Sequence, residues 1–220
     1  PIIWDMIAPD APDTCDWRWT DARMARLRQL GIRVIAGLVH HGSGPRYTNL
    51  LDPLFPEKLA RFAGQVAARY PWIDMWTPVN EPLTTARFSC LYGHWYPHHR
   101  DFASLLRATV IQCRAIALAM QAVRTITPNA QLVQTEDLGR SFSTSALDYQ
   151  AAHENERRWL SLDLLTGRVQ HNTDHGLSDH GVPDCDLAEL RDGMGMPDII
   201  GINHYLTSDR FLDDRTELYP

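Results

Sequence analysis

The stretch that decides the fold is Thr77-Pro78-Val79-Asn80-Glu81-Pro82. It closes an apolar run, residues 72–76, which predicts a buried strand. A carboxylate at the end of a buried strand adds nothing to packing. In a partly desolvated pocket, however, its pKa rises and it can deliver a proton near neutral pH. The neighbouring Asn80 amide can hold a substrate hydroxyl, so we predict that the chemistry of this protein is carried out at this strand end.

Apolar runs alternate with helical patterns along the whole chain. The runs at 2–4, 32–39, 72–76, 131–134 and 198–203 predict strands, and helices are predicted at 20–30, 56–70, 101–126, 147–167 and 186–191. Residues 83–100 are expected to form a long loop. This alternation is typical of a parallel α/β fold. Neither GxGxxG nor a Walker loop follows the first strands, which argues against a nucleotide-binding fold.

Polar residues follow several of the predicted strands. They are His40, Asn80 with Glu81, Glu136, and Asn203 with Tyr205. A (β/α)8 barrel brings such residues from many strand ends to one face, so we expect residues 1–220 to form a single, partial barrel domain. For Glu136 a place in the site and an ion pair with Arg140 are both open, and the ion pair is favoured.

Composition excludes several classes of function. The chain has 220 residues, of which 44% are hydrophobic and 22% charged, as in ordinary globular domains. The net charge of −6 argues against a nucleic-acid partner. Four cysteines without a CxxC pair, and ten histidines without an HExxH motif, argue against disulfides and a metal site. No run approaches the ~18 apolar residues of a membrane span, so we predict a cytoplasmic protein without a membrane partner.

Three ordered blocks of sequence resemble glycoside hydrolase family 1, the β-glucosidase-like retaining glycosidases. Trp76-Thr77-Pro78-Val79-Asn80-Glu81-Pro82 is similar to the family's W-x-T-x-N-E-P. Leu30-Gly31-Ile32 followed by Leu38-Val39-His40 resembles its L-x-x-x-G-I and T-L-Y-H. The stretch from Asp198 to Tyr205 resembles D-F-I-G-I-N-Y-Y. The resemblance implies a (β/α)8 barrel of which this chain carries about strands 2 to 6.

The resemblance also implies a role for each matching residue. Glu81 would be the general acid and base of a retaining hydrolase that cleaves O-glycosyl bonds, and Asn80 would bind the sugar 2-hydroxyl. His40 would hydrogen-bond the ring hydroxyls of the sugar. Tyr205 would contact the nucleophile, and Asn203 would line the same pocket. A small carbohydrate or glycoside is the expected substrate, and no cofactor is required.

The chain departs from the family pattern in two ways. After His40 the family continues with an aromatic residue and Asp-Leu-Pro, whereas this chain has His41-Gly42-Ser43-Gly44-Pro45. The family's nucleophile, a glutamate in an E-N-G motif, and its first strand have no counterpart here. We therefore expect a fragment of a longer protein, with the nucleophile outside this chain. Segments 135–139 and 154–159 indicate a divergent branch, in which such domains can be fused to a dTDP-4-dehydrorhamnose reductase-like domain.

A second function stays open from sequence. A domain of glycosidase fold can bind a sugar or sugar nucleotide without hydrolysing it, as part of a bifunctional protein of carbohydrate metabolism. The altered loop after His40 supports this alternative. The two hypotheses differ in whether a carboxylate nucleophile faces Glu81 in the complete protein.

Overall fold

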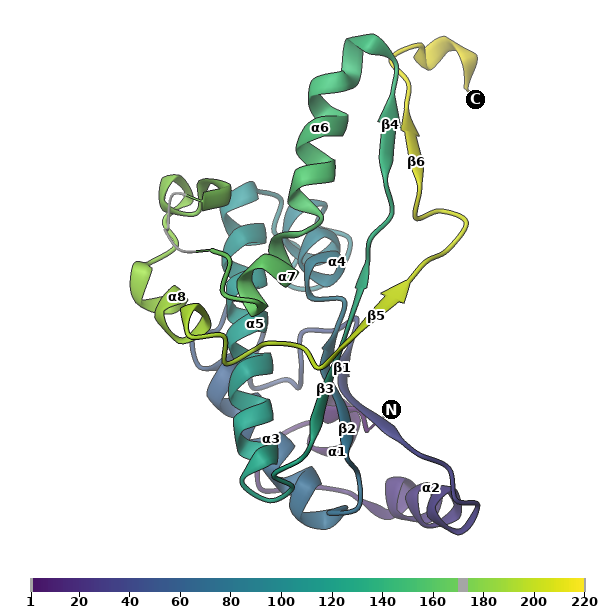
Figure 1. Cartoon of the computed structure of the whole chain (residues 1–220), viewed down its shortest axis with the longest axis vertical. Coiled ribbons are helices and arrows are strands. Elements are labelled where there is room, and N and C mark those ends of the chain that lie inside the picture. The colour runs from purple at the N-terminus through teal and green to yellow at the C-terminus, as the bar shows by residue number, and fades with distance from the viewer. Residues whose placement is uncertain (1, 170–173, 220) are drawn as a thin grey trace.

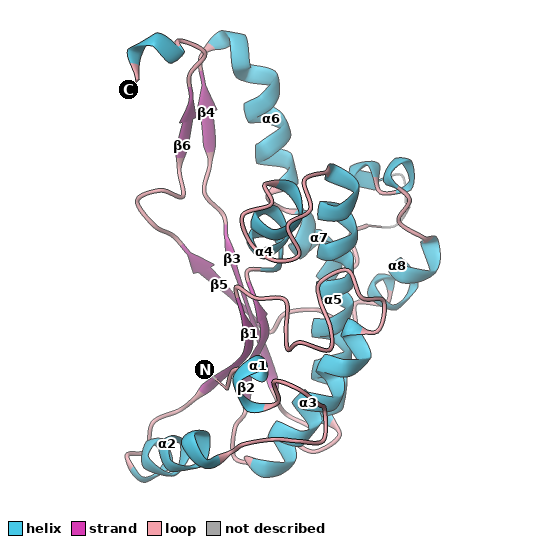
Figure 2. Cartoon of the chain, turned by 180° about the vertical axis from the view of Figure 1, so that it is seen from behind, coloured by secondary structure: helices cyan, strands magenta, loops and turns pink. Residues whose placement is uncertain are grey.

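A computed structural model describes residues 2–169 and 174–219 of the chain, and its core is a parallel sheet. The sheet order is β1-β2-β3-β5. These strands span Ile35–His40, Met75–Asn80, Gln131–Asp137 and Ile199–Asn203. Most of the helices lie along one side of the sheet, as Figures 1 and 2 show from opposite directions. The alternation of parallel strands and helices confirms the predicted α/β class.

The register of the sheet brings the predicted site residues together. Parallel pairing places His40 opposite Asn80, and Asp137 opposite Asn203. The carboxyl ends of all four strands therefore meet at one edge. The inner strand β2 is buried along its whole length, including Thr77 and Asn80, and it begins and ends later than the predicted run 72–76. The outer strand β5 is more exposed, with Ile202 at 64%.

Two long helices, α3 (Phe55–Arg69) and α5 (Phe102–Arg124), pack against each other and form much of the core. Asp101 caps α5 by accepting a hydrogen bond from the Ser104 backbone N–H at 2.7 Å, as Asp does at helix starts. By length and composition α5 could cross a membrane. In this fold, however, 67% of its most apolar 18-residue segment is buried, which is the burial of a core helix.

An extension stands beyond the carboxyl ends of β3 and β5 (Figure 1). It consists of β4 (Ser141–Ser143), β6 (Arg210–Leu212) and α6 (Asp148–Arg157). β4 and β6 pair in parallel, so the segments that follow β3 and β5 are joined to each other. Where they cross, a Cβ added to Gly139 would lie 2.0 Å from the carbonyl oxygen of Ser208. Only glycine permits this approach.

The structure corrects three local expectations. Residues 2–4 do not form a strand: the Ile2 N–H donates to the Gly37 carbonyl at 2.7 Å, but α1 (Trp4–Ile7) begins at once. The predicted loop at 83–100 begins with α4 (Pro82–Ala86) and a π-helical turn, Arg87–Leu91, because Pro82 suits the first turn of a helix. The short strands β4 and β6 have no strong apolar pattern and were not expected.

The other helices agree closely with the predicted ones. They are α2 (Arg18–Gln29), α7 (Leu160–Leu165) and α8 (Asp184–Arg191), with short 3-10 turns at Ser145–Leu147, Asp174–Gly176, Ser178–His180 and Thr216–Leu218.

The tight crossing at Gly139 predicts that Gly139→Ala destabilises the protein. The added methyl group must displace backbone rather than a flexible side chain, so the free energy of unfolding should fall by about 1–3 kcal/mol. Gly42→Ala is the control, because a Cβ there meets no heavy atom within 4 Å. Chemical denaturation of the full-length protein compares the two. Equal stability of both variants would contradict the assignment of Gly139 as a required close contact.

Candidate active site

Glu81 sits at the turn between strand β2 and helix α4, in an unusual backbone conformation. Its φ of 45° and ψ of 65° lie in the left-handed region, which is uncommon for residues other than glycine. Its N–H donates to the Thr135 carbonyl at 3.2 Å, and its carbonyl accepts from the Thr85 N–H at 2.9 Å. Such strain at a strand end is typical of functional sites and persists where neighbours fix it. The Glu81 residue is only 2% exposed.

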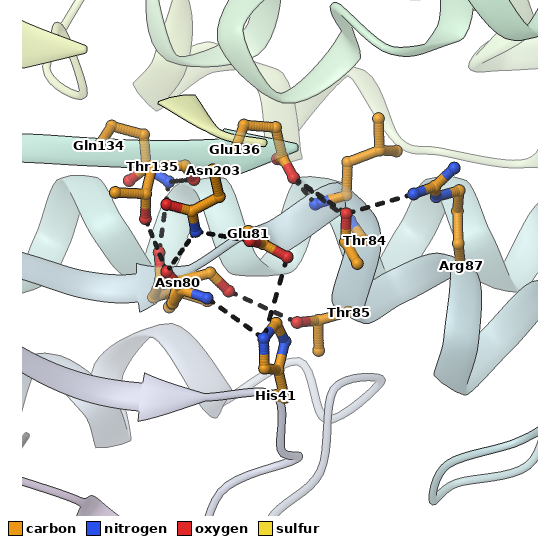
Figure 3. A network of polar contacts seen from close by, with 12 residues as sticks. His41, Asn80, Glu81, Thr84, Thr85, Arg87, Gln134, Thr135, Glu136 and Asn203 are labelled. Atoms are coloured by element: carbon orange, nitrogen blue, oxygen red, sulfur yellow. Dashed lines mark hydrogen bonds and ion pairs between the residues drawn. The ribbon is translucent and has the colours of Figure 1, made fainter. Parts of the chain in front are cut away.

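The carboxylate of Glu81 accepts a hydrogen bond from Asn203, which in turn belongs to a network with Asn80 and Thr135 (Figure 3). Asn203 Nδ2 donates to Glu81 Oε1 at 2.5 Å and to Asn80 Oδ1 at 3.2 Å. Thr135 Oγ1 donates to the same Asn80 oxygen at 2.8 Å. Strands β2, β3 and β5 thus each supply one member of this network. Asn80, Glu81 and Asn203, all predicted from sequence, lie together in the structure.

The histidine closest to Glu81 is His41, not the predicted His40. His41 Nε2 lies 3.9 Å from Glu81 Oε2 and 3.5 Å from Asn80 Nδ2 (Figure 3). His40 ends β1 and is exposed, with its ring centroid 4.4 Å from that of His41. The left-handed φ of 53° at His41 turns the chain at this point. The sequence signal that points to His41 is the departure from the family pattern directly after His40.

Burial sets the protonation state of His41. Desolvation lowers the pKa of His41, and the nearby Glu81 only partly opposes this. The ring is therefore neutral at neutral pH, with Nε2 free to accept from Asn80. His41 Nδ1 is buried and has no hydrogen-bond partner among the described residues. A ring of this kind can bind a neutral hydroxyl, as sugars require.

Glu136 lies near the end of β3, and its side chain caps helix α4. Its carboxylate accepts from the backbone N–H groups of Leu83 at 3.1 Å and Thr84 at 3.4 Å, and from Ser161 Oγ at 2.7 Å. Those N–H groups belong to the first turn of α4, where acceptors stabilise a helix. The favoured ion pair with Arg140 was wrong, because Arg140 lies over the Phe142 ring instead.

The environment of Glu136 strongly disfavours its charged form. Complete burial raises its pKa to about 7, the hydrogen bonds from Ser161 and Leu83 oppose the rise, and the charge of Glu81 adds to it. The sequence predicts that Glu136 lies at the end of a strand, and the structure agrees, since Glu136 is near the end of β3. Its hydrogen-bond partners could not be predicted because they belong to α4 and α7, which are distant in sequence.

Two aromatic residues occupy different places relative to the site. Trp95 lies beside it, with its ring 5.4 Å from that of His41 and stacked on Phe88 at 4.7 Å. It comes from the segment 83–100, which the sequence predicts to be a long loop. Tyr205 is 57% exposed, and its N–H donates to Ser208 Oγ at 2.8 Å. Its predicted contact with the nucleophile stays a prediction.

The arrangement suits proton transfer to and from a neutral ligand. Glu81 supplies one carboxyl, while Asn80, Asn203 and His41 supply neutral hydrogen-bonding groups at the same sheet edge. Among residues 2–169 and 174–219 no group of three or more His, Cys, Asp or Glu could hold a metal ion. The candidate site consists of these four side chains with Trp95 beside them.

The chain was compared with protein-family models, curated proteins and solved structures. The family model described as glycosyl hydrolase family 1 matches residues 43–217. The fold matches a β-glucosidase from Thermotoga maritima solved in complex with cyclophellitol, with a TM-score of 0.74 and 16% identity over 90% of this chain. It also matches that organism's family 1 β-glucosidase (TM-score 0.74, 16% identity, 89% of this chain). These matches confirm a partial (β/α)8 barrel. No curated protein matches the chain by sequence.

The chain matches only part of each of these solved structures. The chain covers 46% and 45% of the two solved structures, so it spans about half of their length. A third match is the same organism's β-glucosidase in complex with deoxynojirimycin, with a TM-score of 0.71 and 15% identity over 89% of this chain and 45% of that one. At these identities the likeness shows the fold.

The raised pKa of Glu136 predicts that the protein loses stability as the pH rises. In the unfolded chain this carboxyl ionises near its ordinary pKa of 4.5, and in the folded protein near 7. Between these values the unfolded state has released the proton that the folded state keeps. The free energy of unfolding therefore falls by up to about 3 kcal/mol across this window and is level above it.

Glu136→Gln should abolish this component, which denaturation of the full-length protein between about pH 5 and about pH 8 would measure. Glu154→Gln is the matched control. Burial raises the pKa of Glu154, but hydrogen bonds from Ser141 and Gln150 lower it, and the net shift is downward. Glu154 therefore ionises below the pH window in which Glu136 does. A Glu136→Gln variant with the same pH slope as the unchanged protein would contradict the assignment.

Proposed function

Because this chain belongs to glycosyl hydrolase family 1, we propose that the complete protein hydrolyses O-glycosyl bonds of a small carbohydrate substrate, with Glu81 as its general acid and base. The observation that carries the proposal is the Glu81 carboxyl itself. It is buried at the carboxyl end of β2, in a strained turn, and is fixed by Asn203 at 2.5 Å. A structural ion pair would not account for a carboxylate whose hydrogen bonds come from neutral groups.

The reaction follows the retaining pathway. Glu81, in its acid form, protonates the leaving oxygen while a second carboxylate attacks the anomeric carbon and forms a covalent glycosyl-enzyme. Glu81 then removes a proton from water, which displaces the sugar and restores both carboxyl groups. In such enzymes the two carboxyl groups lie about 5–5.5 Å apart.

The second carboxylate comes from outside residues 1–220 in this proposal. Glu136 is a buried carboxyl close enough to Glu81 for the charge of Glu81 to raise its pKa. Its oxygens, however, are directed at the Leu83 and Thr84 N–H groups and the Ser161 hydroxyl. A group engaged in capping α4 is not free to attack a sugar, so Glu136 is not the nucleophile.

The neutral groups around Glu81 bind the sugar. Asn80 holds the 2-hydroxyl through its Nδ2, since its Oδ1 already accepts from Thr135 and Asn203. His41 adds a neutral ring at the position between Asn80 and Trp95. The predicted role of His40 toward the ring hydroxyls requires a ligand that reaches the exposed end of β1. The divergent branch, the fused reductase and the cytoplasmic location stay predictions.

Glu81→Gln in the full-length protein tests the acid role. An alkyl glycoside has a poor leaving group and needs protonation, so its turnover should fall roughly 10²–10⁴-fold. An activated aryl glycoside needs less protonation and should lose less in the glycosylation step. Glu156→Gln is the control, because Glu156 is an exposed glutamate on α6. Initial rates on both substrates provide the measurement.

Unchanged alkyl glycoside turnover in Glu81→Gln would refute the assignment. The alternative of a non-hydrolytic sugar or sugar-nucleotide domain gives a different pattern. The unchanged protein would then bind a glycoside saturably in calorimetry and release no product.

A further inference from the structure

Four arginines gather beside the helix that follows Glu81. They are Arg87 at the start of the π-helical turn, Arg157 and Arg158 at the end of α6, and Arg210 at the start of β6. All four line one small cavity together with only two carboxylates, Asp137 and Glu154. In a chain with a net charge of −6, this is a local concentration of positive charge.

The two carboxylates in the lining do not pair with these arginines. None of the four forms an ion pair within 4.0 Å in the described part of the chain. Glu154 instead accepts from Ser141 Oγ at 2.6 Å, and Asp137 accepts from the Gly139 N–H at 3.0 Å. The positive charge of the cluster is therefore not neutralised by close ion pairs.

Arg157 is the most deeply buried of the four arginines. It is only 8% exposed, and among the described residues its side chain makes no hydrogen bond. Burial lowers the pKa of Arg157, and the charges of Arg87 and Arg210 lower it further, whereas Tyr92 and Glu154 act in the opposite direction.

The half-buried Arg87 and Arg158 each make one long hydrogen bond, from Arg87 Nη2 to Thr84 Oγ1 at 3.3 Å and from Arg158 Nη1 to the Leu138 carbonyl at 3.5 Å, while their Nε atoms have no acceptor among the described residues. Guanidinium groups with unused donors bind oxyanions best.

A larger cavity next to the cluster has room for such an anion. It measures about 560 Å³, and its charged lining consists of Arg87, Arg210, Asp137 and Asp209, with Thr84 and Tyr92 beside them. The smaller cavity measures about 20 Å³, which is the size of a water site. Arg87 and Arg210 line both. They are therefore placed to contact an anion directly, while Arg157 and Arg158 support it from behind.

The position of the cluster indicates which part of a substrate would carry the anion. Asn80, Glu81 and His41 lie at the strand ends, where the sugar to be cleaved must sit. The arginines belong to α6, β6 and the turn after α4, and the extension formed by α6, β4 and β6 stands farther out than the strand ends (Figure 1). With the sugar at the strand ends, as the proposed function requires, the leaving group is the part of the substrate that can extend toward the arginines.

We propose that Arg87 and Arg210, supported by Arg157 and Arg158, bind a phosphate or carboxylate group on the leaving-group part of the substrate. The inference rests on the proposed glycosidase function, because it assumes that Glu81 faces the leaving oxygen. It adds a substrate class to that function: glycosides whose aglycone is anionic.

Two aryl glycosides that differ only in an alkyl-linked phosphate on the aglycone test the inference in the full-length protein. The unchanged protein should have the higher kcat/KM on the phosphorylated substrate. Because each charge-assisted hydrogen bond contributes substantially, Arg210→Gln should reduce this preference about 10- to 100-fold. Arg87→Lys and Arg157→Gln should reduce it in the same direction. Arg26→Gln, an exposed arginine on α2, is the charge-matched control and should leave the preference unchanged.

Calorimetry separates this inference from the proposed function. If the phosphorylated glycoside binds more tightly than its neutral counterpart, and Arg210→Gln removes the difference, the anion site stands even where no product forms. Equal affinity and equal kcat/KM for both glycosides would overturn it. Inorganic phosphate that binds at Arg210 while the two glycosides are not distinguished would also overturn it, since the site would then take a free ion. Melting curves of each variant identify unfolding, and Arg210→Lys replaces any variant that does not fold.

Discussion

The rest of the site depends on the hydrogen bonds from the first turn of α4 to the buried carboxylate of Glu136. Helix starts need acceptors, and most find them in the preceding residue. Here the preceding residue is Glu81, whose own side chain is directed to Asn203. Glu136 on the neighbouring strand supplies the missing acceptor, so Glu81 can hold its left-handed backbone and keep its carboxyl for chemistry. The cost is a second carboxyl buried close to the first.

Sequence predicted the fold well because the signals for it are local. The apolar run that β2 completes, the Asp101 cap of α5 and the helical spacing of α3 each depend on near neighbours. The extension was not predicted, because β4 and β6 are short and their pairing joins segments about 70 residues apart in sequence. Tertiary contact, rather than intrinsic preference, decides such strands.

In the candidate site, too, some residues could be predicted from local sequence and others depend on tertiary contacts. Asn80, Glu81 and Asn203 were predicted because strand ends in a parallel sheet converge, a rule that acts on sequence position alone. The choice between His40 and His41 depends on a left-handed turn at His41, which no pattern in the chain announces. The partners of Glu136 lie on helices far from it in sequence, so only the folded structure distinguishes a helix cap from the ion pair that was favoured.

The parallel pairing of β4 with β6 has a consequence for how this protein can change. The segments after β3 and β5 form one wall, joined along the ribbon and pressed together where Gly139 meets Ser208. An insertion in either segment alone would shift the register of the ribbon and disturb the other.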